Sequence, residues 1–263
     1  MKRTGITLYD LYAQRLLPLL ALLGLVLVWE VLCRLFNVPE YVLPAPSVIF
    51  EAFLNVDGQR WFDHLWATLR VALLGFALAV SISIPMAIMM VRSAFLARTL
   101  LPFLIIVQST PIVAVAPLII VILGAGEAPR TVIACLISFF PIVVATTSGL
   151  LSTPKEMLEL SNSLKASPAR QIWQVRLPYA VPHIFSGLKV AITLAIIGAV
   201  IAEFVAAEQG LGYFVQFSTS YFRIPQAFAA LFFLSMVSLL LFKAVQLVQQ
   251  TFFSWSLPAD EEH

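Results

Sequence analysis

Few residues in this chain could do chemistry, and their spacing argues against an enzyme. The 263 residues include three histidines, His64, His183 and His263, which are scattered along the sequence. Both cysteines, Cys33 and Cys135, lie within apolar runs, where a buried small side chain is the usual role. No CxxC or HExxH occurs, so we expect no metal site and no catalytic residue.

The chain also lacks a phosphate-binding loop. No GxxxxGK[ST] pattern occurs, so nothing in the sequence is suited to cradle the phosphates of ATP. We expect no cofactor bound by this chain. A process driven by ATP and Mg²⁺ would need an ATPase on another chain.

Polar residues within apolar segments are the next candidates, because ionisable groups in hydrocarbon cost about 2.5–3.5 kcal/mol at the bilayer centre. Glu30 is flanked by Trp29 and Arg34 and is interpreted as an anchor near the membrane interface. Glu203 is expected in a polar pathway or an interhelical contact. We expect a translocation pathway to include Glu203 together with a polar cluster in the middle of an apolar run: Gln108, Ser109 and Thr110.

The longest charged interruption of the apolar sequence runs from Lys155 to Pro178. Pro154 and Glu156 suit the first turn of a helix, and the apolar residues that follow recur at helical spacing. Ser167-Pro168 is expected to end this helix and to start a second one. Leu177-Pro178 is then expected to break the second helix. Two short helices of this kind form a knob that a soluble partner could grip.

The elements around this loop are membrane spans. The composition is 60% hydrophobic and 11% charged with a mean hydropathy of +0.95, whereas soluble domains carry about 25% charged residues. About 20 apolar residues cross the hydrocarbon core. The sequence predicts a short helix over 47–54 with Ser47 as N-cap, and six spans over 16–36, 68–91, 100–123, 131–151, 181–207 and 227–248.

The fifth span carries small residues at three- and four-residue intervals, which indicate close packing of another helix: Gly187, Ala191, Ala195, Gly198 and Ala202. Six spans place both termini on one side, and the positive charges favour the cytoplasm for that side. The inside would hold Lys2, Arg3, Arg15, Arg92, Arg98, Lys155, Lys165, Arg170 and Arg176, against Arg34, Arg60, Arg70, Arg130 and Arg223 outside.

At this point the loop resembles the EAA loop of permease subunits of binding-protein-dependent ABC importers. The family pattern is Glu-Ala-Ala, three residues, Gly, nine residues, Ile, any residue, Leu-Pro. Here Glu159-Leu160-Ser161 takes the first part, Lys165 takes the Gly position, and Val175-Arg176-Leu177-Pro178 closes the pattern at the same spacing. Both alanines and the glycine are replaced, so the resemblance does not determine the detailed geometry of the bend between the two short helices. The strings 43–48, 68–70, 202–204 and 210–213 are similar to the nitrate, sulfonate and taurine branch of this family.

The resemblance implies an all-α integral membrane protein with the type I importer fold: six transmembrane helices and a cytoplasmic two-helix coupling loop. It divides the chain into residues 1–65 (N-terminal segment, first span and external connection), a five-helix permease core over 66–252 with the coupling loop at 153–178, and a cytoplasmic tail over 253–263. The implied partners are two ABC ATPase subunits, a second permease copy and an external binding protein, in the inner membrane. The coupling-loop residues are Glu156, Glu159, Ser161, Lys165, Ala166, Arg170, Arg176, Leu177 and Pro178.

Two other classes of protein compete with this interpretation. An ion-coupled secondary transporter would use Glu203 or Glu30, although no inverted repeat is apparent. A membrane enzyme has no cluster of His, Asp or Cys to support it. The solute stays open between nitrate, sulfonates, taurine and pyrimidine, thiamine-precursor or riboflavin-type compounds, because the binding protein usually sets selectivity in such importers.

Overall fold

A computed structural model describes residues 8–257, with side chains described from residue 16 onward. Lys2, Arg3 and the acidic end of the predicted tail lie outside these residues, and Arg15 lies outside those whose side chains are described. The described chain is helical and contains no strand. Its residues fall into two compact units, one made of 1–58 and 215–232, the other of 59–214 and 233–263.

The first unit contains α1 (Leu8–Leu35), α2 (Pro46–Leu54), most of α10 (Leu211–Ser220) and the start of α11 (Ile224–Phe252). The ring of Trp29 on α1 lies 6.4 Å from the ring of Phe228 and 6.1 Å from that of Phe232. Most of the other large apolar side chains on α1 are exposed, as expected for a helix that meets lipid or another chain.

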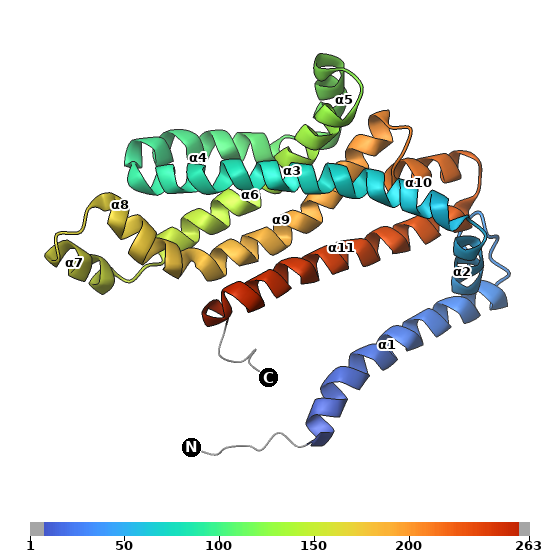
Figure 1. Cartoon of the computed structure of the whole chain (residues 1–263). Helices are drawn as coiled ribbons and strands as arrows, with labels where there is room; N and C mark the ends of the chain where they lie inside the picture. Colours follow the sequence, from blue (N-terminus) through green and yellow to red (C-terminus); the bar gives the residue numbers. More distant parts are fainter. Residues whose placement is uncertain (1–7, 258–263) are drawn as a thin grey trace. The chain divides into compact units, whose positions relative to one another are not determined.

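The second unit is built around a hairpin of two antiparallel helices, α6 and α9, which lie side by side along their length (Figure 1). Its helices are α3 (Gly58–Arg92), α4 (Ala94–Ser109), α5 (Ile112–Leu123), α6 (Glu127–Leu151), α7 (Lys155–Ser163), α8 (Pro168–Gln171), a π-helical turn η1 (Ile172–Arg176) and α9 (Leu177–Ala206). The greater part of α11 also belongs to it.

Three glycines bring α6 and α9 into close contact. A Cβ atom on Gly149 would lie 2.7 Å from Cβ of His183, and one on Gly187 would lie 2.6 Å from Cβ of Ala145. A Cβ on Gly198 would lie 2.7 Å from Cα of Ala134. Ala191, Ala195 and Ala202 on the same helix are fully buried. The predicted packing role of the small residues in the fifth span is therefore confirmed.

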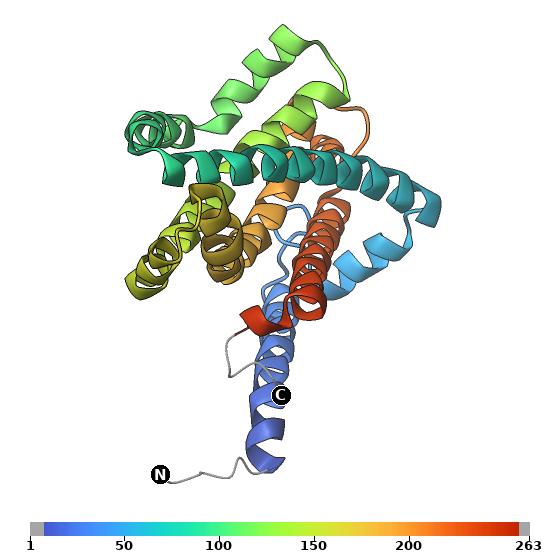
Figure 2. The ribbon, with the colours of Figure 1, turned by 60° about the vertical axis from the view of Figure 1, so that its left-hand side comes forward.

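The predicted third span is not one straight helix. α4 and α5 meet at a bend of 96°, visible where the chain turns between them in Figure 2. Pro111 lacks a backbone N–H and disfavours a helical conformation in the residue before it, and Thr110 is extended with φ −79° and ψ 124°. With this bent pair counted as one span, the described residues contain six candidate spans, as predicted.

Two helix starts differ from the predictions. α3 begins at Gly58, ten residues before the predicted second span, and at 35 residues it exceeds the length that hydrocarbon requires. α2 begins at Pro46, so Ala45 occupies the N-cap position and makes no side-chain cap. The prediction of Ser47 as N-cap is wrong, because the proline one residue earlier already adopts a helical φ at the first position.

Candidate functional site: the charged loop and the polar cavity

The charged loop has the predicted two helices, α7 and α8, and a Schellman motif ends the first of them. The N–H of Ala166 donates to the carbonyl of Ser161 at 3.0 Å, and the N–H of Lys165 donates to that of Asn162 at 2.9 Å. Lys165 has φ +54°, in the left-handed region. The bend between the helices thus persists although lysine replaces glycine.

This geometry gives a physical reason for the glycine of the family pattern. The Lys165 position is the C′ residue of the motif, which glycine occupies most readily because it has no Cβ. A residue with a side chain pays about 1–2 kcal/mol in this conformation. The substitution therefore affects the stability of the loop while leaving its path unchanged.

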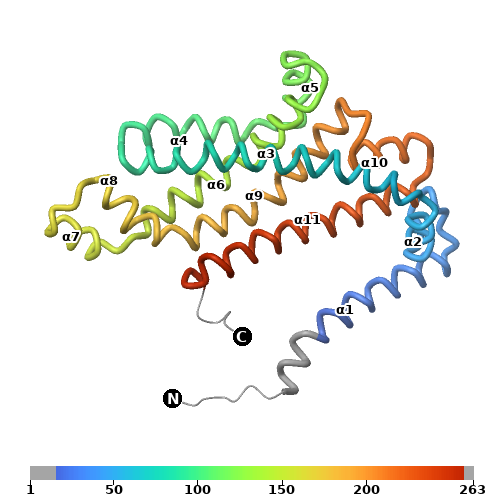
Figure 3. Tube along the Cα trace, in the orientation of Figure 1, coloured from blue at the N-terminus to red at the C-terminus, as the bar shows by residue number. Residues whose placement is uncertain are grey.

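The predicted break at Leu177-Pro178 is wrong. Residues 168–206 form one continuous helical segment in which α8 passes through η1 into α9 (Figure 3). The N–H of Leu177 donates to the carbonyl of Ile172, five residues back. Pro178 lies in the first turn of α9, and the wider π turn before it accommodates the missing donor.

The loop presents two kinds of residue. Glu156, Glu159, Lys165 and Arg170 are exposed, and so are the apolar side chains of Met157, Leu160, Leu164 and Trp173. Ser161 is buried and Ala166, Arg176, Leu177 and Pro178 are partly buried. A surface that mixes exposed charges with exposed apolar groups is suited to bind a protein.

One side-chain contact ties the loop to the helix hairpin, and a second joins the two helices of the loop. Nη1 of Arg176 donates to the carbonyl of Leu150, at the end of α6, at 3.0 Å. Nε2 of Gln171 donates to Oδ1 of Asn162 at 3.3 Å and links α8 to α7. The loop is thus attached directly to the end of the α6–α9 hairpin.

The other end of this hairpin carries a cluster of buried polar side chains that cap α10. Nδ1 of His64 accepts from the N–H of Gly210 at 3.2 Å, and Oγ1 of Thr68 accepts from that of Leu211 at 2.8 Å. Oε2 of Glu203 accepts from the N–H of Gly212 at 2.7 Å. These donors are among the first N–H groups of a helix, which have no partner within it, and a carboxylate is favoured there.

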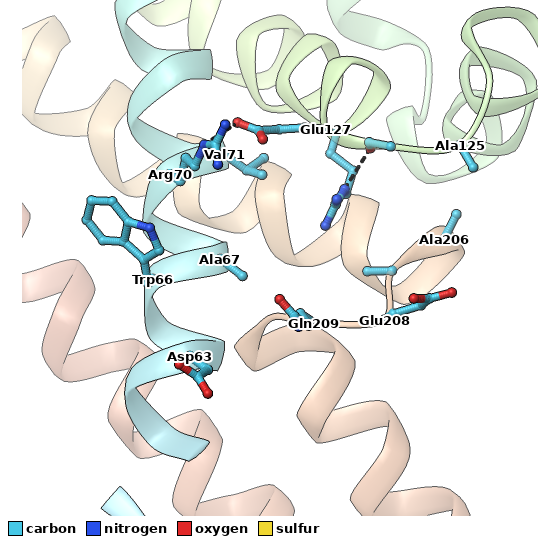
Figure 4. A pocket seen from close by; sticks show the side chains of 13 residues that line it. Asp63, Trp66, Ala67, Arg70, Val71, Ala125, Glu127, Ala206, Glu208 and Gln209 are labelled. Carbon is cyan, nitrogen blue, oxygen red and sulfur yellow. Dashed lines mark hydrogen bonds and ion pairs between the residues drawn. The ribbon is translucent and has the colours of Figure 1, made fainter. Parts of the chain in front are cut away.

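A cavity of about 950 Å³ lies beside this cluster. Figure 4 shows Asp63 and Ala67 from α3, Glu127 from the start of α6, and Glu208 and Gln209 from the segment between α9 and α10 around it. Nε of Arg70 pairs with Oε1 of Glu127 at 2.8 Å. Nε of Arg130 donates to the carbonyl of Gly126 at 2.8 Å. The complete lining is Asp63, Trp66, Ala67, Arg70, Val71, Ala125, Gly126, Glu127, Arg130, Ala206, Ala207, Glu208 and Gln209.

The residues expected to line a pathway are placed apart. Gln108, Ser109 and Thr110 are exposed at the bend between α4 and α5. Oγ of Ser109 and Oγ1 of Thr110 donate to carbonyls one turn earlier, at 2.8 and 3.0 Å. Glu203 is fully buried near the end of α9. Within the described chain, no hydrogen bond joins it to Gln108, Ser109 or Thr110.

Glu30 lies in the first unit and also serves a helix start. Its carboxylate pairs with Arg34 and accepts from the backbone N–H of Ser47 at 3.0 Å, at the beginning of α2. The hydroxyl of Ser47 donates to Glu30 at 2.8 Å. Glu30 and its predicted neighbour Arg34 thus form an ion pair, and the contact with Ser47 was not foreseen; the anchor role of Glu30 stays a prediction.

Sequence reasoning also missed the roles of His64, Thr68 and Arg130. Thr68-Leu69-Arg70 and Gly210-Leu211-Gly212 drew attention only as strings that resemble a family. Their pairing joins residues about 140 positions apart in the chain, with separations of 146 and 143. No local sequence pattern predicts a contact between residues so far apart in the chain.

Comparison with known proteins agrees with this description. The family described as "Binding-protein-dependent transport system inner membrane component" matches residues 79–254. The "Formylaminopyrimidine transport permease protein ThiX" of Halalkalibacterium halodurans is 32% identical over 92% of this chain and 96% of its own length. The "Taurine transport system permease protein TauC" of Escherichia coli is 28% identical over 88% of this chain and 86% of its own length.

A solved structure shares the fold. A chain of the inward-facing MetNI methionine ABC transporter superposes with a TM-score of 0.62 at 20% identity, over 73% of this chain and 94% of the other. The type I importer fold expected from the resemblance is therefore confirmed. Nothing in these comparisons supports the ion-coupled alternative. This chain belongs to the family of inner-membrane permease components of binding-protein-dependent ABC importers, a multi-pass membrane protein that translocates a small solute.

Proposed function

We propose that the loop from Lys155 to Pro178 is the surface that receives an ABC ATPase. The observation that carries this proposal is the direct attachment of the loop to the helix hairpin, through the Arg176–Leu150 hydrogen bond and the continuous run from α8 into α9. Movement of the bound ATPase would reach the spans without an intervening flexible linker. Such rigid-body motion is a common way to drive alternating access.

The exposed and the buried residues of the loop have different proposed roles. Glu156, Glu159, Lys165 and Arg170 contact the ATPase, together with the exposed apolar side chains. The shape of the charged loop is maintained by its buried and partly buried residues: Ser161, Ala166, Arg176, Leu177 and Pro178. ATP and Mg²⁺ act on the ATPase, so the permease itself is not an enzyme.

The assembly we propose contains two copies of this permease, two ATPase subunits and an external binding protein in the inner membrane. Both termini and the charged loop would be cytoplasmic. Gln108, Ser109 and Thr110 line the pathway, because polar side chains exposed at a bend in an apolar span are unfavourable against lipid. Glu203 contributes to the pathway indirectly, by holding the segment next to the cavity.

Co-purification tests this function. The tagged chain and its cognate ABC ATPase are expressed together and solubilised, and the bound ATPase is measured. We expect Leu164→Asp, which places a charge on the most exposed apolar side chain of the loop, directly after α7, to reduce the bound ATPase at least about tenfold. The matched control is Leu54→Asp on α2, also an exposed leucine, which should leave the bound ATPase unchanged. Equal retention of the ATPase by both variants and the original chain would exclude the loop as its docking surface.

A further inference from the structure

The cavity between α3, α6 and the segment from Ala206 to Gln209 has an unbalanced set of charges. Its lining contains three carboxylates, Asp63, Glu127 and Glu208, and two guanidinium groups, Arg70 and Arg130. Glu127 is already paired with Arg70 at 2.8 Å. The carboxylates of Asp63 and Glu208 therefore face the cavity in excess over the cation of Arg130.

The size of the cavity suits a small organic solute. Its volume of about 950 Å³ lies near the upper end of the range of roughly 300–1,000 Å³ that is usual for ligand pockets. A monatomic ion or nitrate would leave most of this space filled with water. The amide of Gln209 and the guanidinium of Arg130 add hydrogen-bond donors to the same lining.

The wall of the cavity is held in place by buried contacts. The backbone amides directly after Gln209 are fixed by the three side-chain acceptors His64, Thr68 and Glu203. A site whose walls are preorganised loses less free energy on binding. The position of Glu208 and Gln209 is therefore set before any solute arrives.

We propose that this cavity binds a neutral or cationic solute that carries amino groups and a hydrogen-bond acceptor, and that it disfavours free anions. The amino groups donate to Asp63 and Glu208, and the acceptor receives from Arg130 or Gln209. Beside the Arg70–Glu127 ion pair, sulfonate or nitrate would meet two carboxylates, Asp63 (which also accepts from Gln59) and Glu208, for one guanidinium, that of Arg130. This inference rests on the proposed importer function and narrows its solutes toward amino-bearing heterocycles.

Direct binding to the assembled complex tests the inference. The full chain with its ATPase is placed in lipid nanodiscs without a binding protein, and equilibrium dialysis is carried out with cytosine, uracil and isethionate. Cytosine carries an amino group and a carbonyl, uracil lacks the amino group, and isethionate is a free anion. We expect saturable binding of cytosine, with uracil several-fold weaker and isethionate weaker still.

Variants locate the binding in the cavity. Glu208→Gln and Asp63→Asn should each weaken cytosine binding about tenfold, because a hydrogen bond to a charged carboxylate is replaced by a weaker one to a neutral amide. Glu51→Gln, on an exposed position of α2, is the control and should bind as the original chain does. Isethionate binding that exceeds cytosine binding, or equal binding of cytosine by all variants, would overturn the proposal, as would the absence of saturable binding by any probe.

The two proposals can fail separately. If the ATPase co-purifies but the cavity shows no preference for the amino-bearing probe, the solute class is wrong and the importer function stands. If the ATPase does not associate while cytosine binds and depends on Glu208, the coupling loop is wrong and the cavity assignment stands.

Discussion

The carboxylate of Glu203 accepts a hydrogen bond of 2.7 Å from the backbone N–H of Gly212 at the start of α10. The carboxylate of Glu30 accepts one of 3.0 Å from Ser47 at the start of α2. Both acids thus satisfy donors that a helix leaves unpaired at its first turn. A capping role accounts for two charges in apolar segments without any ion transport.

Removal of the Glu203 carboxylate should destabilise the protein without changing the energy source that drives transport. We expect Glu203→Ala to cost about 1–2 kcal/mol, as for the loss of a helix cap, and Glu203→Gln to cost less because its amide oxygen still accepts. The measurement is the midpoint of thermal unfolding in detergent, followed by size-exclusion fluorescence. Uptake by the Glu203→Gln complex should persist with an uncoupler present. Uncoupler-sensitive uptake by the original chain would contradict this and restore the ion-coupled alternative.

Gly210 should tolerate no side chain. Its φ is +128°, and a Cβ atom there would collide with the carboxylate of Glu203. Gly124 has φ +81° but nothing within 4 Å of a built Cβ, so Gly124→Ala isolates the cost of the backbone conformation, about 1–2 kcal/mol. We expect Gly210→Ala to lower the unfolding midpoint further than Gly124→Ala. Similar midpoints for both would show that the collision is relieved at no cost.

Lys165→Gly should stabilise the charged loop. Glycine adopts φ +54° without the steric cost that lysine pays, so the expected gain is about 1 kcal/mol for local opening of α7. Hydrogen exchange of the α7 amides measures this gain as roughly fivefold slower exchange. Lys155→Gly, at the first residue of the same helix, removes the same charge and should not slow exchange. Unchanged exchange in Lys165→Gly would mean that the left-handed conformation carries no strain.

Arg176 should be required for coupling but not for ATPase binding. Its Nη1 donates at 3.0 Å to the carbonyl of Leu150, so Arg176→Met removes the link between η1 and the end of α6. We expect the ATPase to remain bound while solute uptake per ATP hydrolysed falls several-fold. The readout is the ratio of uptake to hydrolysis in proteoliposomes, with Arg98→Met, an exposed arginine on α4 outside the loop, as the control. A parallel loss of ATPase binding would assign Arg176 to the docking surface instead.

The sequence predicts the features of this protein that depend on composition and local spacing. Six spans, a short helix before the second span and two helices in the charged loop follow from hydropathy, prolines and helical periodicity, and the structure confirms them. The spacing of the family pattern also identified the loop, because the C′ position of a Schellman motif is a local feature.

The errors occur where a distant or unusual contact decides the outcome. A π turn carries the helix past Pro178, and one proline at position 111 bends a span by 96° whereas those inside α3 and α6 do not end their helices. Prolines in both situations look alike in the sequence. The caps formed by Glu203, His64 and Thr68 depend on tertiary packing, and no spacing rule predicts them.

The α6–α9 hairpin separates the charged loop from the cavity by the length of α6, 25 residues or about 37 Å at the usual rise. Close packing at its glycines makes the hairpin rigid, with the charged loop at one end and the cavity at the other. The charged loop and the lining of the cavity are both attached to this hairpin but have no residue in common. If the loop binds the ATPase and the cavity binds the solute, as proposed, substitutions that change solute preference can accumulate at one end while the other keeps its fit, and one type of ATPase could serve permeases with different solutes.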